Sequence, residues 1–266
     1  MSEYFTVENG PVTTITFNQA KKHNAFDDAF VAALTRTLKQ ISKDKNCRVI
    51  LLKAEGKSFS AGADLNWMKR MSEYSHMENY DDAKDLARLM EVLNNLPQIV
   101  IAAVQGPAYG GGVGLVACCD IVVAVESVQF CLSEVKLGLV PGAISPYVIR
   151  AIGARQARRY FASAERFSAQ KACEIGLVHE VVEDQKQLDV FIEKLSVDLL
   201  KGGPKAQQLA KKMALDLGGR PIIDHYVIED SVKWIVGCRE SSEGIEGMSA
   251  FLEKRSPQWA KNSDKK

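Results

Sequence analysis

Two short stretches of small residues, each directly after an apolar run, could bind a negatively charged oxygen. Residues 59–64 follow the apolar run 49–54, and residues 108–114 follow the run 99–104. Small residues at a turn let a ligand approach backbone N–H groups without a side chain in the way. A helix beginning near Gly112 would add unpaired donors and the positive end of a helix dipole. Two such turns side by side would aim two N–H donors at one oxygen, which stabilises an enolate or another oxyanion.

The glycine run Gly110-Gly111-Gly112 also has a simpler interpretation, because glycines can be required only for close packing. A dinucleotide site is the weaker alternative, since the spacing G-x-G-x-x-G is not matched in register. No Gly-Lys-Ser/Thr follows the run, and this excludes a P-loop. The turn by itself therefore leaves packing and oxyanion binding open.

Glu134 is the carboxylate best suited to proton transfer. It lies in the run Phe130-Cys131-Leu132-Ser133-Glu134-Val135, with apolar residues on both sides. A glutamate in a partly dry site has a raised pKa, which suits an acid or base working near neutral pH. The alternative is a surface glutamate paired with Lys136.

Hydrophobic periodicity predicts the elements that position these residues. Residues 5–8 and 12–17 predict a hairpin, and a helix over 27–43 can be capped by Asp27 or Asp28. Strands are expected at 48–54, 99–104 and 121–125, and helices at 81–96 and 112–118, with a polar loop over 72–81. Beyond Gly153 the pattern is mainly helical, with helices expected at 154–162, 168–176, 188–199, 204–217, 224–238 and 241–254 and strand character at 178–182. The fold class is therefore α/β.

Composition sets limits on partners and compartment. The chain has 266 residues, a formal net charge of +1 and 46% hydrophobic residues, as in ordinary globular proteins. This charge gives no general reason to expect nucleic acid or a membrane as partner. Six cysteines without a C-x-x-C pair and four scattered histidines favour free thiols in a reducing compartment and no metal site. No leader is apparent in residues 1–10, so we expect a cytoplasmic protein.

The ordered motifs of the chain resemble the crotonase (enoyl-CoA hydratase/isomerase) family over nearly its whole length. They are His23-Asn24-Ala25-Phe26, Ser60-Ala61-Gly62-Ala63-Asp64, Gly110-Gly111-Gly112, Cys119-Asp120-Ile121, Ser133-Glu134-Val135-Lys136-Leu137-Gly138-Leu139, Pro141-Gly142 and Ala250-Phe251-Leu252-Glu253-Lys254-Arg255. The resemblance implies a crotonase-like spiral of ββα turns over residues 1–195 that carries the acyl-CoA site. It further implies a C-terminal helical trimerisation region over 196–266, in a homotrimer or a dimer of trimers.

The resemblance also implies roles for individual residues. The backbone N–H groups of Ala63 and Gly111 would hold the thioester oxygen of an acyl-CoA, and Glu134 would move the proton. Coenzyme A belongs to the substrate, and no separate cofactor is expected. Its contacts would be Lys22, Ala61, Asp64, Leu65, Phe251 and Lys254, the last two from the same or a neighbouring subunit. Solvated lysines at 22 and 254 and a core role for Phe251 are the alternatives.

One position departs from the family pattern. Typical enoyl-CoA hydratases have a second glutamate three residues beyond Gly111, where this chain has Gly114. Either Glu134 hydrates alone, or a carboxylate on the substrate orients the water. Alternatively, the enzyme moves a double bond from C3 to C2, as single-glutamate isomerases of the family do. Asp120 and Glu126 do not obviously substitute.

The runs at Gly110–Leu115, Cys118-Cys119-Asp120, Phe130–Val135 and Ile144-Ser145-Pro146 resemble a bacterial branch of the family. Its members are the methylglutaconyl-CoA and isohexenylglutaconyl-CoA hydratases of leucine and acyclic-terpene breakdown. This favours hydration of a carboxylated, branched enoyl-CoA such as 3-methylglutaconyl-CoA. The alternatives are an isomerase, another crotonase-type reaction, and a non-catalytic binding or scaffold protein.

Two further features concern the acyl group. Trp67, Met68, Met71 and Tyr74 form an apolar stripe that either lines the acyl pocket or belongs to the core. Lys69, Arg70 and Arg150 are the cations considered for binding a substrate carboxylate, and the sequence does not choose among them.

Overall fold

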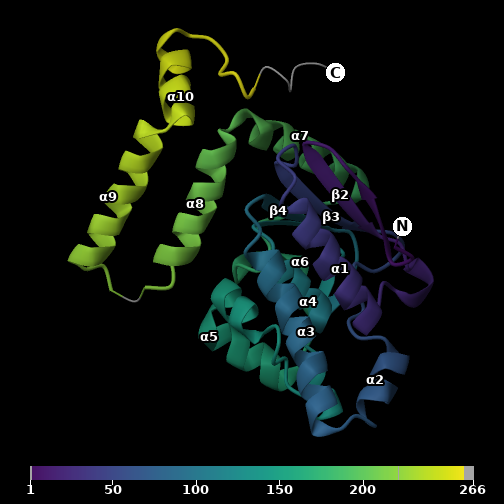
Figure 1. Cartoon of the computed structure of the whole chain (residues 1–266). Coiled ribbons are helices and arrows are strands. Elements are labelled where there is room, and N and C mark those ends of the chain that lie inside the picture. Colours follow the sequence, from purple (N-terminus) through teal and green to yellow (C-terminus); the bar gives the residue numbers. More distant parts are fainter. Residues whose placement is uncertain (1, 221, 261–266) are drawn as a thin grey trace.

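A six-stranded sheet forms the centre of the molecule, with its strands in the order β1-β2-β3-β4-β6-β9. The computed structural model describes residues 2–220 and 222–260 (Figure 1). β1 and β2 form the predicted antiparallel hairpin, and the other neighbours pair in parallel. Parallel strands covered on both faces are apolar throughout, which explains the continuous runs in the sequence. The strands are β1 (Phe5–Glu8), β2 (Val12–Phe17), β3 (Val49–Ala54), β4 (Ile99–Val104), β6 (Ile121–Val125) and β9 (Glu180–Val182).

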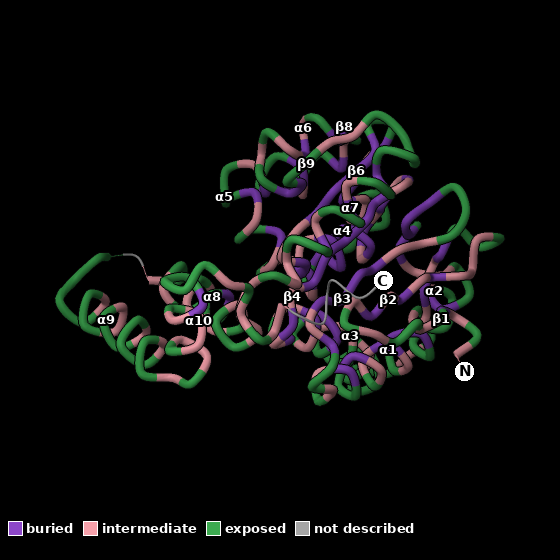
Figure 2. Tube along the Cα trace, turned by 90° about the horizontal axis from the view of Figure 1, so that it is seen from above, coloured by how far each residue is buried: buried purple, intermediate pink, exposed green. Residues whose placement is uncertain are grey.

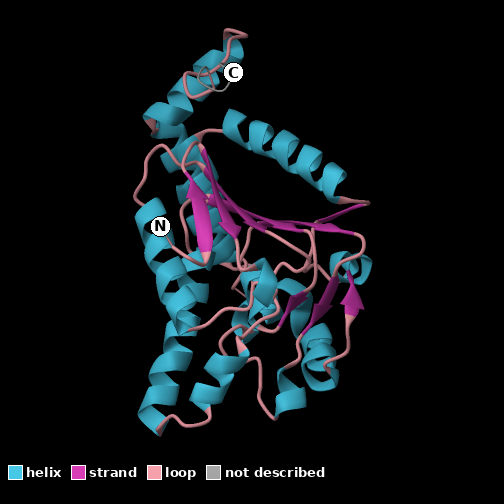
Figure 3. Ribbon diagram, turned by 90° about the vertical axis from the view of Figure 1, so that its right-hand side faces the viewer, coloured by secondary structure: helices cyan, strands magenta, loops and turns pink. Residues whose placement is uncertain are grey.

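A second, three-stranded sheet has the order β5-β7-β8. Its strands are β5 (Ala108–Tyr109), β7 (Gln129–Cys131) and β8 (Phe167–Ser168). Figure 3 shows this small sheet apart from the large one, with helices and loops between them. β5 leads into the glycine run and β7 leads toward Glu134, so this sheet sets the position of both.

Helices cover the large sheet. α1 and α3 pack against each other, and α7 lies against β3, β6 and β9. A short helix adjoins each small-residue stretch: α2 begins directly after the first, and α4 begins within the second, at Gly111. The helices of this body are α1 (Asp28–Ile41), α2 (Leu65–Met71), α3 (His76–Asn94), α4 (Gly111–Ala117), α5 (Ser145–Ser163), α6 (Ala169–Glu174) and α7 (Gln185–Lys201), with 3-10 turns η1 (Ala20–Lys22) and η2 (Glu134–Leu137).

The last three helices project from the body as an arm (Figures 1 and 2). They are α8 (Pro204–Leu217), α9 (His225–Glu240) and α10 (Ser242–Leu252), close to the predicted ranges. The domain boundary predicted after residue 195 falls inside α7, which continues along the sheet to Lys201 before the arm begins. Within the described residues, no helix has both the length and the apolar character of a membrane span.

The structure differs from the predicted helices at two places. The loop expected over 72–81 ends early, because α3 begins at His76. Ser75 and Glu78 form a capping box there, each side chain accepting a bond from the backbone N–H of the other residue. The helix predicted over 154–162 is the part of α5 that follows a break at Gly153, which has φ 75°, whereas the part from Ser145 to this break was not predicted.

Candidate active site

The first small-residue turn is held in place by Phe26. The N–H of Phe26 donates to the carbonyl oxygen of Gly62 over 2.9 Å, and the N–H of Asp64 donates to Phe26 over 3.0 Å. The residue between them, Ala63, forms an isolated bridge with Phe26, and its own N–H has no acceptor within the described chain. Gly62 makes the turn possible at φ 87°, a conformation that favours glycine.

The second turn lies directly against the first. The N–H of Tyr109 donates to the carbonyl oxygen of Ser60 over 2.9 Å. A Cβ atom built on Gly62 would lie 3.8 Å from the nitrogen of Gly111. Gly111 is the first residue of α4, and its N–H likewise has no acceptor among the described residues. The structure therefore brings together Ala63 and Gly111, the two predicted donors.

The glycines are also required for packing. A Cβ atom on Gly111 would lie 2.5 Å from Cζ of Phe26, and one on Gly112 would lie 2.8 Å from the carbonyl oxygen of Ser60. Ser60 belongs to the first turn, and Phe26 is hydrogen-bonded to it through Gly62. Close packing, the alternative considered from the sequence, therefore also requires these glycines, in addition to the hydrogen bond from Tyr109 to Ser60 that joins the two turns.

Glu134 lies beside the second turn. A Cβ atom on Gly110 would be 3.3 Å from its Oε1, and its Oε2 is buried without a hydrogen-bond partner in the described chain. Burial raises the pKa of this carboxyl, and a hydrogen bond with its own backbone acts in the opposite direction. The pairing with Lys136 considered from the sequence is absent from the described ion pairs. A half-buried carboxyl with one oxygen lacking a partner, beside N–H donors without acceptors in the described chain, is suited to moving a proton next to an oxyanion.

The family model for enoyl-CoA hydratase/isomerase matches residues 7–262. The chain belongs to this family. An enoyl-CoA hydratase structure from Shewanella pealeana is similar with a TM-score of 0.93 and 43% identity, over 97% of this chain and 96% of that one. This confirms the predicted crotonase-type fold.

Two curated relatives are similar over most of both chains. A mitochondrial methylglutaconyl-CoA hydratase from Mus musculus is 31% identical over 95% of this chain and 80% of its own length. A 2,3-dehydroadipyl-CoA hydratase from Escherichia coli is 31% identical over 97% of this chain and 98% of its own length.

The position of the second glutamate of typical family members is closed. A Cβ atom on Gly114 would lie 2.2 Å from Cγ2 of Ile144 and 3.3 Å from Cε of Met90. The missing carboxylate was evident from the sequence, but the side chains that fill its place were not. Ile144 stood among the family-like motifs, yet nothing in the sequence joins it to Gly114.

Asp120 and Glu126 are the first two acids that follow α4 in the sequence, and neither replaces the missing glutamate. Asp120 accepts a bond from Lys211 over 2.7 Å and one from the N–H of Val100 over 2.8 Å. Burial raises the pKa of Asp120, and Lys211 acts against this shift. Glu126 is exposed after β6. Neither provides the second acid of a family hydratase.

Three of the predicted coenzyme A residues lie on one surface beside the first turn. Lys22 ends η1, Ala61 donates its N–H to His23 over 2.9 Å, and Leu65 begins α2; their side chains are exposed. Asp64 lies there too, but Oδ1 of its carboxylate accepts the N–H groups of Asn66 and Trp67, so this side chain caps α2.

The remaining two predicted contacts lie elsewhere. Phe251 is 82% exposed on α10, and Lys254 follows that helix. α10 is at the far end of the molecule from α2 (Figure 1). Within one chain the structure does not bring these two residues to the site.

The apolar stripe after the first turn is buried at Trp67 and half-buried at Met68, Met71 and Tyr74. Trp67 is 1% exposed and donates Nε1–H to Asp82 over 2.9 Å, so the core alternative holds for this residue. Arg70 forms an ion pair with Asp28 over 2.5 Å, and Lys69 is exposed.

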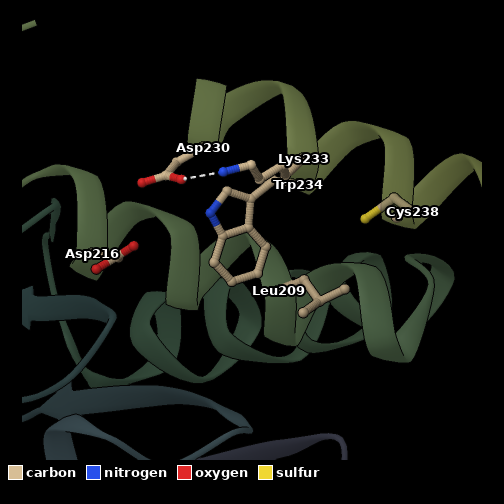
Figure 4. A pocket seen from close by; sticks show the side chains of 7 residues that line it. Leu209, Asp216, Asp230, Lys233, Trp234 and Cys238 are labelled. Carbon is tan, nitrogen blue, oxygen red and sulfur yellow. Dashed lines mark hydrogen bonds and ion pairs between the residues drawn. The ribbon is translucent and has the colours of Figure 1, made fainter. Parts of the chain in front are cut away.

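Arg150, the third cation, lines a cavity of about 700 Å³ between α8 and the corner of α3 and β4. A neighbouring cavity between α8 and α9 is lined by Leu209, Asp216 and Trp234, among others (Figure 4). None of the predicted catalytic or coenzyme A residues lines either cavity. In the described part of the chain, no cluster of His, Cys, Asp and Glu could hold a metal ion.

Proposed function

We propose that this enzyme adds water across the 2,3-double bond of an enoyl-CoA whose acyl group carries its own carboxylate, such as 3-methylglutaconyl-CoA. Membership of the family and its similarity to named hydratases make the chain an enzyme of the enoyl-CoA hydratase type. The observation that carries the proposal is the buried, unpartnered Oε2 of Glu134 beside two N–H groups without acceptors in the described chain.

Ala63 and Gly111 would bind the thioester carbonyl oxygen through their N–H groups. When a nucleophile adds at C3, electrons move onto this oxygen and form an enolate. Donors already fixed by the packing of Phe26 need no reorganisation at that moment, and the N-terminus of α4 favours negative charge. Losing one such donor typically lowers the rate by about 10²–10³-fold.

Glu134 would act first as a base and then as an acid. Its carboxylate takes a proton from water while the water oxygen bonds to C3. The resulting carboxylic acid gives this proton to C2 as the enolate collapses. The water thus supplies both OH and H, and Glu134 returns to the carboxylate. A pKa raised by burial keeps the two protonation states closer in free energy near neutral pH.

The carboxylated acyl group is supported by the single acid and by the relatives. Methylglutaconyl and dehydroadipyl groups, after which two relatives are named, both derive from dicarboxylic acids. The free carboxylate of such an acyl group would accept a hydrogen bond from the attacking water. A second glutamate of the protein would otherwise accept this bond.

Coenzyme A would bind on the surface formed by Lys22, Ala61 and Leu65, with the backbone at Asp64. Exposed apolar side chains on the arm support assembly into a homotrimer or a dimer of trimers; Phe251 and Tyr226 are 82% and 75% exposed. A neighbouring copy could then bring Phe251 and Lys254 to the adenine and phosphates. The mass of the protein in solution tests this assembly.

Isomerisation of a 3-enoyl-CoA is the second candidate, and the closed position at Gly114 favours it. Moving a double bond needs one group that removes a proton at C2 and returns it at C4, which Glu134 alone can do.

Absorbance of the conjugated thioester distinguishes the two. The protein is incubated separately with 3-methylglutaconyl-CoA, a 2-enoyl-CoA and a 3-enoyl-CoA. We expect loss of signal with the first. A gain with only the 3-enoyl compound would favour isomerisation, and no change with any substrate would contradict both reactions.

A further inference from the structure

Ile144 lies at the start of α5, where its backbone already has right-handed helical dihedral angles, φ -95° and ψ -17°. Its side chain is 2% exposed, so it packs in the interior at this end of the helix.

The side chain of Ile144 packs against α4. Its Cγ2 and Cβ would lie 2.2 and 2.8 Å from a Cβ atom on Gly114. Gly114 lies one helical turn beyond Gly111, the first residue of α4. Gly110 lies beside the Glu134 carboxylate, and the N–H of Gly111 has no acceptor among the described residues. Ile144 and Met90 therefore fill the space beside Gly114, one turn of α4 from the reaction site.

Glu134 has no charged partner across this site among the described side chains. The pKa of its carboxyl is shifted by burial and by its own backbone, and by no neighbouring charge. Asp120 is bound to Lys211, and Glu126 is exposed. A water attacking C3 therefore has one carboxylate of the protein to hold it, whereas orienting a water well requires a second acceptor.

We propose that Ile144 is a specificity-determining residue. Its side chain, supported by Met90, closes the place on α4 where the protein could supply that second acceptor, so efficient hydration requires one carried by the substrate. This inference rests on the proposed function. It restricts the enzyme to enoyl-CoA substrates with a carboxylate and makes crotonyl-CoA, which has none, a poor substrate.

The wild-type protein gives the first test. A well-placed acid–base group contributes about 10²–10⁴-fold to a rate. We therefore expect kcat/KM for hydration of crotonyl-CoA to be at least about 10²-fold below that for 3-methylglutaconyl-CoA. Equal values for the two substrates would overturn the role of Ile144 and leave the hydratase function standing. Hydration of neither substrate would overturn both.

The variant pair Ile144→Gly with Gly114→Glu gives the second test. Ile144→Gly opens the space by removing a buried isoleucine side chain, and the glutamate at position 114 then occupies part of it. We expect the double variant to raise crotonyl-CoA hydration by at least about 10-fold. Gly114→Glu alone should lose activity and melt at a lower temperature, because Ile144 still fills the space.

The matched control is Ile144→Gly with Gly114→Gln, which has the same volume and no carboxylate. No gain is expected from it. An equal gain in the glutamine and glutamate double variants would overturn the proposal. Circular dichroism checks that the variants fold. If the double variants do not fold, the test is the ratio of kcat/KM for 3-methylglutaconyl-CoA to kcat/KM for crotonyl-CoA in the wild-type protein.

Discussion

The backbone N–H of Tyr109 donates to the carbonyl oxygen of Ser60 over 2.9 Å, and this bond joins two turns that lie far apart in the sequence. Ser60 also donates its hydroxyl to Asn24 and accepts the N–H of Gly62. The first turn is thereby bonded to both the second turn and the segment before α1. The distance between the two N–H donors thus depends on packing around Ser60, and substitutions that separate the turns should reduce catalysis more than folding.

Gly62→Ala tests this dependence. The new Cβ would lie 2.9 Å from the carbonyl oxygen of Tyr109, at φ 87°. We expect the turns to separate and kcat/KM to fall about 10²–10³-fold, as when an oxyanion donor is lost. The matched control is Gly153→Ala, at φ 75° with no atom within 4 Å of the new Cβ. Both variants strain the backbone at a positive φ, but only Gly62→Ala also brings the new Cβ against the second turn. Steady-state kinetics and thermal melting are measured for both, and an equal loss of activity in the two variants would contradict the prediction.

Glu134→Gln should abolish proton transfer while keeping the shape of the site. We expect kcat to fall by about 10²–10⁴-fold with KM changed little, since the thioester is held by backbone groups. The control is Glu126→Gln, which alters an exposed carboxylate and should keep full activity. Near-normal hydration by the Glu134→Gln variant would remove this residue from the mechanism.

The raised pKa of Glu134 has consequences for both activity and stability. Burial lifts the pKa above its ordinary value of 4.5, so kcat/KM should decline on the acid side with a midpoint above 4.5. In the folded protein the ionised form is disfavoured. The contribution to stability is therefore full below the pKa of the unfolded chain and is lost as pH rises through the raised folded pKa.

Thermal melting of Glu134→Gln across pH checks this sign. The variant should match the wild type at pH below about 4 and become the more stable protein as pH rises through the raised pKa. A stability advantage for the wild type near neutral pH would show that an unrecognised partner stabilises the carboxylate.

Lys211→Met should strongly destabilise the attachment of the arm. Lys211, from α8, bonds Asp120 over 2.7 Å, and their side chains are 5% and 21% exposed. Removing one partner leaves a buried charge uncompensated, which costs about 3–5 kcal/mol in free energy of unfolding. The double variant with Asp120→Asn should recover much of this loss. Urea unfolding measures both, and a loss in the double variant equal to the sum of the two single losses would contradict coupling.

Local patterns predicted helix α8 over its full range and the hairpin of β1 and β2, because periodicity and turn residues act within a few positions. They failed at the start of α3, although Ser75 and Glu78 carry a readable capping-box spacing. Residues 72–81 are mostly polar, and this composition favoured a loop over the helix start that the capping-box spacing indicates. Trp67 was ambiguous for a different reason: an apolar side chain on a short helix faces either a pocket or the core, depending on what packs above it.

Residue types and their order were enough to predict the strands of the large sheet, most of the long helices and the family, and to single out Glu134. They did not predict the short helix α2, the small sheet or the first part of α5. Only the folded chain shows that the turns of Ala63 and Gly111 lie against each other, with both N–H groups lacking an acceptor among the described residues. It also shows that Ile144 closes the space at Gly114. It also separates Phe251 and Lys254 from the turns of their own chain. Such relationships join residues remote in sequence through packing, and packing depends on the position of every neighbouring side chain at once.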